Sequence, residues 1–428
     1  MRRLLTIVHR YTGLLLVPFL LIVGLTGSAL AFYHELDRWL NPSMLTVPVL
    51  QTSDQASPFD PFALRERTES QEPRAQVDWF DLTFEPGQAY RLFLLPRINP
   101  QSGLPYDLSY NEIYFNPYTG ERTGTRTWGE VSLAKENILS FLYRLHYALA
   151  LPEHLAMFGM TVLGVIALLW FLDSFIGFYL TVPQQRVKQP LPFKQYWQRW
   201  KPAWHIKPSR FNYDLHRACG LWLWPVLLVL AWSGVAFNLK EVYQPVMSSV
   251  LNMRDLDALP RLDKPLKTPG LDWRAAHQFG QKYIQRSSEE YGFVIEREQS
   301  LFLDRVHGVY HYRVKTDHDY GKNGATIVVL NADTGELVAL TTPATDSIGD
   351  VVHRWITWLH TARVLGLPMQ ILICMTGLIV AILSVTGIVI WSRKHRIQKA
   401  KAITWESVAL LRKQRLIALR SSLHNAQK

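Results

Sequence analysis

The stretch HRYTGLLLVPFLLIVGLTGSALAFY, residues 9–33, decides the fold, because it returns as HRACGLWLWPVLLVLAWSGVAFNL at residues 216–239. Both copies begin with His-Arg and carry Gly, Pro and Gly at four, nine and eighteen residues after the His. Each contains about twenty apolar residues, enough for one helix to cross a hydrocarbon core of about 30 Å. We therefore predict two membrane spans related by an internal repeat, and a chain made of two halves.

The positive charge of the chain, +11 over 428 residues, gathers beside the apolar segments. Lys and Arg cluster at residues 2–3, 186–210 and 393–401. Basic residues next to spans mark the cytoplasmic side of a membrane, so we expect a lipid bilayer as the partner of these charges and no nucleic acid. The two cysteines, Cys219 and Cys374, both lie within apolar spans, which predicts neither a disulfide framework nor a zinc site.

The first thirty residues also have the features of a secretory signal, with a basic start, an apolar middle and small residues at 28–31. The same pattern recurs inside the chain, where no signal peptidase would act. We therefore interpret it as an uncleaved span that runs outward.

A polar block follows each repeated span, and both blocks contain the turn Asn-x-x-Thr-Gly-Glu, at residues 116–121 and 331–336. Glycine in such a turn supplies the positive φ that the backbone needs. The blocks are therefore predicted to be repeats as well. The expected strands are 89–95, 112–115, 308–315 and 325–330, and the expected helix is 272–286.

The second and fourth spans also correspond, since Leu145-His146 matches Leu359-His360 and Gly177 matches Gly387. The segment from about residue 132 to 181 is too long for one crossing, at about 75 Å of helix. We expect an interfacial helix, a bend near Pro152 and then the span proper. The basic tail is predicted to be an amphipathic helix on the inner leaflet.

The predicted fold is a mainly α membrane protein with four transmembrane helices in two pseudo-symmetric halves and two α+β outer domains. The predicted boundaries are 1–40 for the first transmembrane helix, 41–131 for the first outer domain, 132–182 for the interfacial helix and second span, 183–213 for a basic cytoplasmic loop, 214–240 for the third span, 241–348 for the second outer domain, 349–392 for the next interfacial helix and fourth span, and 393–428 for the cytoplasmic tail.

Four histidines occupy repeat-related positions: His9 and His216 at the inner starts of spans one and three, His146 and His360 near the outer ends of spans two and four. Ionisable groups at such positions are costly and usually functional. Two imidazoles that face each other across a bundle are the ligands of a b-type haem. Two such pairs predict two haem b groups and a path for electrons across the membrane, with one haem as the alternative.

Neighbouring residues suit the same chemistry. Haem propionates accept charge-assisted hydrogen bonds, and the glycines at 13, 27, 220 and 234 would let a flat macrocycle or another helix approach the backbone. His34 follows the first span without a counterpart in the third, and we keep it as a reserve outer ligand. The candidate propionate partners are Arg10, Arg217, Arg144, Arg354 and Arg363.

Simpler interpretations exist for each residue taken alone. A single His at a helix end is usually an interfacial polar residue, and the glycines suit helix packing equally well. The matched positions in both halves are what favour haem. No Gly-rich phosphate loop and no Cys-x-x-Cys-His motif occurs, so neither a nicotinamide or flavin fingerprint nor a covalent c-type haem is predicted. Electrons would come from a quinol or a cytoplasmic donor.

These motifs resemble the PepSY-associated transmembrane helix family. The resemblance rests on His-Arg-x-x-Gly-Leu with Thr26-Gly27, on a Leu-His segment before the second span, and on the stretch LHTARVLGLP at residues 359–368. The turns ending in Thr-Gly-Glu are similar to the PepSY module, a helix packed on a small antiparallel sheet. The resemblance covers nearly the whole chain except the basic tail. The family has Gly where this chain has Ala362.

The resemblance implies an iron-regulated protein of the inner membrane of Gram-negative bacteria, with both outer domains in the periplasm. Some family members are di-haem reductases of ferric siderophores, so the implied role is a b-type ferric-siderophore reductase with His9, His216, His146 and His360 as haem ligands. The alternative is a membrane-anchored PepSY module that binds a peptide or a protease without redox activity. A siderophore permease is less favoured, because four spans with large outer domains leave little room for alternating access.

Overall fold

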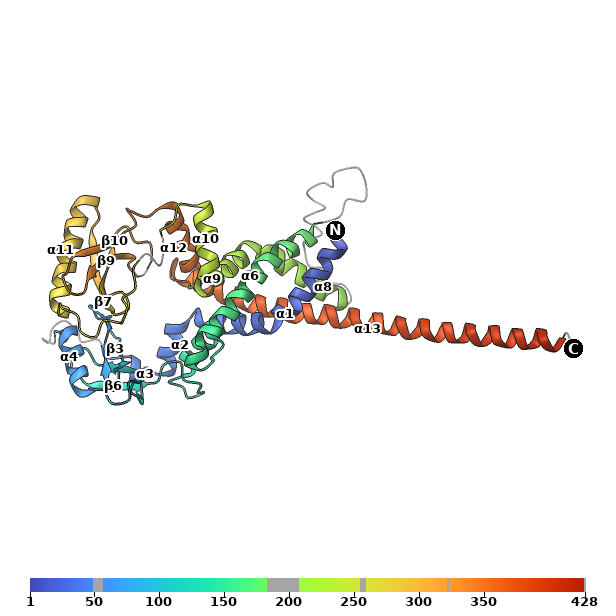
Figure 1. The fold of residues 1–428 in the computed structure, drawn as a ribbon, viewed down its shortest axis with the longest axis horizontal. Helices are drawn as coiled ribbons and strands as arrows, with labels where there is room; N and C mark the ends of the chain where they lie inside the picture. Colours follow the sequence, from blue (N-terminus) through green and yellow to red (C-terminus); the bar gives the residue numbers. More distant parts are fainter. Residues whose placement is uncertain (49–56, 183–207, 255–258, 322, 427–428) are drawn as a thin grey trace. The chain divides into compact units, whose positions relative to one another are not determined.

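The computed structural model describes residues 1–48, 57–182, 208–254, 259–321 and 323–426 (Figure 1). The chain divides into two compact units, and both halves of the sequence contribute to each of them. We call them the inner unit and the outer unit, after the membrane sides that the sequence predicts for their histidines. The inner unit contains Met1–Leu21, Leu169–Leu228 and Leu378–Lys428, and the outer unit contains Ile22–Leu168 and Val229–Gly377.

Three helical segments of the described chain are long and apolar enough to cross a membrane, and there are four if one bent pair of helices counts as a single span. The protein is therefore a multi-pass membrane protein. The helices of these segments are α1 (Arg2–Leu30), α5 (Ile138–Ala148), the short 3₁₀ helix η1 (Glu153–Leu155), α6 (Ala156–Thr181), α8 (Pro208–Trp222), α9 (Trp224–Asn238) and α13 (Leu367–Ala426). The predicted break near Pro152 is confirmed, since it separates α5 from α6.

The third span differs from the straight helix predicted from His216. It begins at Pro208, so His216 lies inside α8, and α8 and α9 meet at a bend of 69°. Pro225 explains the bend, because it has no N–H for the carbonyl of Leu221 and its ring crowds that carbonyl. The repeat-related Pro18 stays inside a continuous α1. Of the predicted basic loop 183–213, residues 183–207 lie outside the described residues, and 208–213 form the first turns of α8.

The C-terminal tail is helical, as predicted, but it is not a separate helix. It continues α13 without a break, so that α13 has 60 residues and a length of about 90 Å.

The segments between the spans form small helices and antiparallel sheets in the outer unit. One sheet has the strand order β10-β9-β8-β7-β2, a second has the order β3-β5-β6, and β1 pairs with β4. The predicted strands and helix are confirmed. The elements are α2 (Tyr33–Leu40), α3 (Pro42–Leu45), α4 (Pro61–Gln71), β1 (Ala75–Gln76), β2 (Trp79–Asp81), β3 (Tyr90–Phe93), β4 (Leu95–Pro96), β5 (Glu112–Phe115), β6 (Arg122–Arg126), α10 (Lys240–Val250), α11 (Trp273–Tyr291), β7 (Ile295–Asp304), β8 (Val309–Thr316), β9 (Thr326–Asn331), β10 (Leu337–Thr341) and α12 (Ile348–His360).

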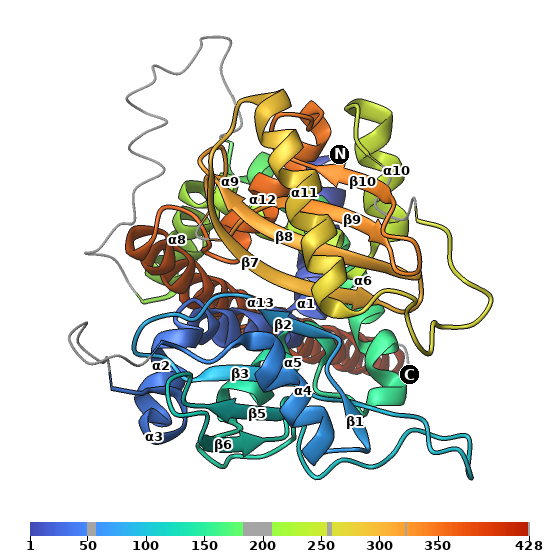
Figure 2. The same ribbon diagram turned by 90° about the vertical axis from the view of Figure 1, so that its left-hand side faces the viewer.

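The two polar blocks share one sheet, which the sequence analysis did not predict. Strand β2 of the first block pairs antiparallel with β7 of the second, with Phe80 opposite Leu301. Helix α11 lies across one face of this sheet (Figure 2). The repeated turns agree with prediction, because Gly120 and Gly335 have φ of 68° and 76° and each donates its N–H to the Asn four residues earlier.

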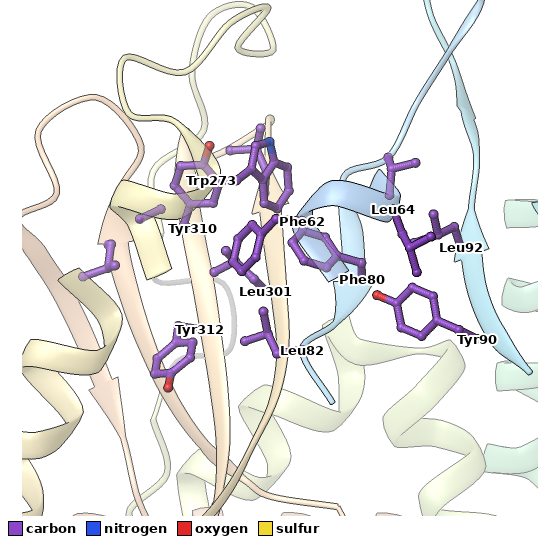
Figure 3. Packing of buried hydrophobic residues seen from close by; sticks show 14 of the residues in the cluster. Phe62, Leu64, Phe80, Leu82, Tyr90, Leu92, Trp273, Leu301, Tyr310 and Tyr312 are labelled. Atoms are coloured by element: carbon purple, nitrogen blue, oxygen red, sulfur yellow. The ribbon is translucent and has the colours of Figure 1, made fainter. Parts of the chain in front are cut away.

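A single hydrophobic core joins the two blocks. Phe62 and Phe80 of the first block pack edge to face, and Phe80 also contacts Trp273 of the second (Figure 3). Trp273 in turn contacts Tyr310 on β8. The blocks that the sequence suggested as two separate modules therefore form one folded body.

Candidate functional site

The structure brings the four repeat-related histidines together as two pairs. In the inner unit, the rings of His9 on α1 and His216 on α8 have centroids 6.5 Å apart and planes inclined by 62°. In the outer unit, the rings of His146 on α5 and His360 on α12 have centroids 6.2 Å apart and planes inclined by 77°. Each pair joins one histidine from each half of the sequence, as the repeat predicts.

These separations suit two axial ligands of one metal. A metal–imidazole bond is about 2.0 Å long and an imidazole centroid lies about 1.1 Å behind its nitrogen, so two rings that hold one ion between them have centroids about 6.2 Å apart. The two observed separations, 6.2 and 6.5 Å, are close to this value. Two histidine rings that merely pack edge to face also have such distances. A metal site additionally requires that the two facing nitrogens carry no hydrogen, so the hydrogen bonds of each ring bear on the choice between a metal site and simple packing.

A hydroxyl group fixes the tautomer of His146. The Thr26 Oγ1 lies 2.9 Å from the Nδ1 of His146 and also donates to the carbonyl of Ile22, four residues earlier on α1, at 2.7 Å. Because its proton is already used, this oxygen accepts from the ring, so Nδ1 carries the hydrogen and Nε2 keeps its lone pair. The same arrangement holds for Ser233 Oγ with His360 Nδ1 at 2.5 Å and the Val229 carbonyl at 2.7 Å, and for Thr386 Oγ1 with His216 Nδ1 at 2.8 Å and the Ile382 carbonyl at 2.7 Å.

The fourth histidine has a carboxylate instead. The Nδ1 of His9 lies 2.8 Å from the Oδ2 of Asp173 on α6. An ionised carboxylate can only accept, so the ring donates from Nδ1 here as well. In their neutral state all four imidazoles therefore present an unprotonated Nε2, the form that binds a metal when the other nitrogen is held by an acceptor.

Glycines make room for three of the rings. A Cβ atom at Gly27 would lie 3.0 Å from the Cε1 of His146, one at Gly177 would lie 3.3 Å from the Cε1 of His9, and one at Gly387 would lie 3.5 Å from the Cε1 of His216. Gly27 and Gly387 directly follow the hydroxyl residues that hold the rings. The hydroxyl orients the imidazole, and the glycine beside it lets the ring approach the helix.

These residues fit a b-type haem at each pair. The spacing, the shared tautomer and the glycine positions are those that two axial histidines need. Within the described part of the chain, no cluster of three or more His, Cys, Asp or Glu side chains could hold a bare metal ion.

A known protein family matches most of the chain. The chain matches the sequence model of the PepSY-associated TM region over residues 6–394. The protein belongs to this family. A search among curated proteins finds no match to the chain.

The arginines predicted to hold propionates in this PepSY-associated protein differ in their surroundings. Arg10 is half-buried near His9, and Arg363 is exposed in the turn after α12, three residues beyond His360. Arg217 contacts Asp214 at 3.1 Å, while its buried Nε has no hydrogen-bond partner among the described residues. Arg144 donates to the carbonyls of Gly129 and Leu151, and Arg354 pairs with Asp346, so these two are already engaged.

The reserve ligand His34 follows α1 in the sequence. It is exposed on the short helix α2, where its ring contacts Tyr33.

Ala362, where the family has Gly, adopts a φ of 53°. This left-handed conformation costs a residue with a Cβ about 1–2 kcal/mol. The side chain is buried in a small cluster with Ala31, Met369 and Ile373. Alanine at this position therefore has a strained backbone, and its methyl group adds a packing contact close to the outer pair.

The face of the shared sheet opposite α11 carries charged side chains. The strand register aligns Asp81, Ser300 and Arg313 across β2, β7 and β8. Burial raises the pKa of Asp81 to about 6, although the charges of Arg91 and Arg313 oppose this shift. Partial burial and the nearby charge of Arg363 lower the pKa of Arg313. Arg313 therefore lies within the field of the turn that follows His360.

Three of the residues that hold the imidazoles were not predicted from the sequence: Thr386, Ser233 and Asp173. Two signals could have found them. Thr26-Gly27, Ser233-Gly234 and Thr386-Gly387 are a repeated hydroxyl–glycine doublet, and Asp173 is an acid inside an apolar span, where ionisable residues are usually functional.

Proposed function

We propose that this protein is a haem b-containing reductase of the bacterial inner membrane, which passes electrons from a quinol or a cytoplasmic donor to a ferric siderophore in the periplasm. The proposal rests on one observation. The structure contains two histidine pairs, and all four rings have an acceptor at Nδ1. Four imidazoles with free Nε2 atoms at matched positions serve no purpose in a protein that only anchors a binding module.

The chain's residues would divide the work as follows. His9 with His216, and His146 with His360, would each hold the iron of one haem, while Asp173, Thr386, Thr26 and Ser233 hold the rings in the required tautomer. Arg10, Arg217 and Arg363 are the candidates to hold propionates. A bound haem would supply the one-electron redox chemistry that the reaction needs.

We place the ferric chelate against the face of the shared sheet opposite α11. Arg313 and Arg363 are both exposed, and the charge of one acts on the other, so an anionic chelate near them would be attracted by two positive charges. Hard oxygen donors such as hydroxamates hold Fe(III) much more tightly than Fe(II), so reduction of the iron releases it for uptake.

The test uses the full-length protein in liposomes with a reductant enclosed and a ferric hydroxamate outside, together with an impermeant Fe(II) indicator. We expect Fe(II) to form outside, with loss of the signal in His9→Ala and in His360→Ala, while His154→Ala, an exposed histidine of η1, stays active. A haem-loaded protein whose haems reduce and that still yields no external Fe(II) would refute the substrate assignment. A protein without haem would favour the membrane-anchored PepSY binding module.

A further inference from the structure

The two histidine pairs differ in one group, Asp173. Three of the imidazoles donate to neutral hydroxyls, whereas His9 donates to this carboxylate at 2.8 Å. The Asp173 side chain is 7% exposed, and its second oxygen, Oδ1, is buried without a hydrogen-bond partner among the described residues. The inner pair therefore contains a buried negative charge that the outer pair lacks.

A buried carboxylate with an unsatisfied oxygen is expensive in an apolar span. Holding the tautomer of His9 does not require it, because a hydroxyl does the same at the other three rings. The second half of the chain shows the alternative directly: helix α13 has Thr386 before Gly387, where helix α6 has Ile176 before Gly177. Asp173, one turn earlier on α6, takes over the role of the missing hydroxyl with a full charge added.

A carboxylate partner changes the imidazole electronically. An acceptor on the far nitrogen raises the basicity of the nitrogen that binds the metal. In addition, a fixed negative charge in a low-dielectric surrounding stabilises the more positive of two oxidation states. Both effects favour ferric over ferrous iron at the inner pair.

We propose that Asp173 lowers the reduction potential at the His9–His216 pair below that at the His146–His360 pair and thereby gives electron transfer its outward direction. This inference rests on the proposed haem function. His9 and His216 would hold the haem that takes one electron from the quinol or cytoplasmic donor, which is oxidised. His146 and His360 would hold the haem that gives one electron to the ferric chelate, whose iron is reduced.

The experiment is a redox titration of the purified full-length protein, followed by its haem absorption. We expect two one-electron transitions in the wild type, of which the lower disappears in His9→Ala and the higher in His360→Ala. Asp173→Asn keeps an acceptor for the ring but removes the charge. This variant should raise the midpoint potential of the lower transition by at least 59 mV, which is a tenfold change in the equilibrium constant for one electron, and leave the higher transition unchanged.

A second variant keeps the test decisive where Asp173→Asn loses the inner haem. Asp173→Leu combined with Ile176→Thr transfers the α13 arrangement onto α6, and it should bring the two transitions together. The ferric low-spin EPR spectrum gives an independent readout, because the signal lost in His9→Ala should be the one that moves in the Asp173 variants.

Three outcomes are distinguishable. A wild-type protein without haem refutes the proposed function itself. A haem-loaded protein in which His9→Ala removes the higher transition overturns the direction inferred here. Retention of both haems in Asp173→Asn with the lower transition unmoved overturns the role of the carboxylate.

Discussion

Replacement of Thr26 by valine tests whether the hydroxyl at the outer pair has the role assigned to it. Valine has the shape of threonine but cannot accept the Nδ1 hydrogen of His146, so the packing is preserved and the hydrogen bond is lost. A buried donor left without its partner costs about 1–3 kcal/mol. The carbonyl of Val23 also lies within hydrogen-bonding reach of this ring, which softens the loss. We therefore expect about 1–2 kcal/mol, or a 5- to 30-fold faster release of haem from the outer pair.

The assay is haem transfer to an excess of apomyoglobin, measured in the His9→Ala background so that only the outer pair is loaded. Thr161→Val is the matched control, because the hydroxyl of Thr161 is exposed and bonds only the carbonyl of Met157 on its own helix. An unchanged release rate in Thr26→Val, or an equal increase in Thr161→Val, would refute the assignment of the Thr26 hydroxyl to His146.

Four further outcomes are expected. Gly177→Leu should remove the inner haem and keep the outer one in a haem assay, since a Cβ at residue 177 would lie 3.3 Å from the Cε1 of His9. Arg126→Met should lower the stability of the outer unit by about 3–5 kcal/mol, because the buried carboxylate of Asp37 loses its guanidinium partner and that of Glu112 keeps Arg91 alone. Thermal unfolding measures the change, with the exposed Arg74→Met as the control. Burial alone would raise the pKa of Glu298, but hydrogen bonds from His277, Tyr312 and Gln281 lower it to about 2. The wild type should therefore lose stability as the pH falls from 4.5 toward 2, and Glu298→Gln should lose less stability over this range, as measured by denaturant titration. Arg313→Gln should raise the KM for an anionic ferric chelate and leave that for a neutral one unchanged.

The repeat made the spans and the histidine pairs predictable. His9 and His216 have the same spacing to Gly27 and Gly234 in their own spans, and a two-fold arrangement of such copies places matched residues face to face. The polar blocks were predictable at their repeated turns, because Gly120 and Gly335 are required by the positive φ there.

Contacts between distant segments could not be read from local pattern. Strand β2 has only three residues and joins a sheet made by residues more than 200 positions later, which no alternation of polar and apolar residues reveals. The bend at Leu223 was not predictable either, because Pro18 and Pro225 correspond in the repeat and only Pro225 accompanies a break between helices. The partners of the imidazoles depend on the register between helices, so Asp173 and Thr386, which do not correspond in sequence, play the same part at His9 and His216.

The measurement that tests the central proposal most directly is the absorption spectrum of the purified full-length protein, oxidised and dithionite-reduced, with haem quantified per chain. We expect a sharp b-type α-band on reduction and close to two haems per chain. His9→Ala and His360→Ala should each remove one, and His34→Ala should remove neither. A colourless protein from haem-replete cells, or a haem content unchanged in both ligand variants, would contradict the assignment of the two histidine pairs.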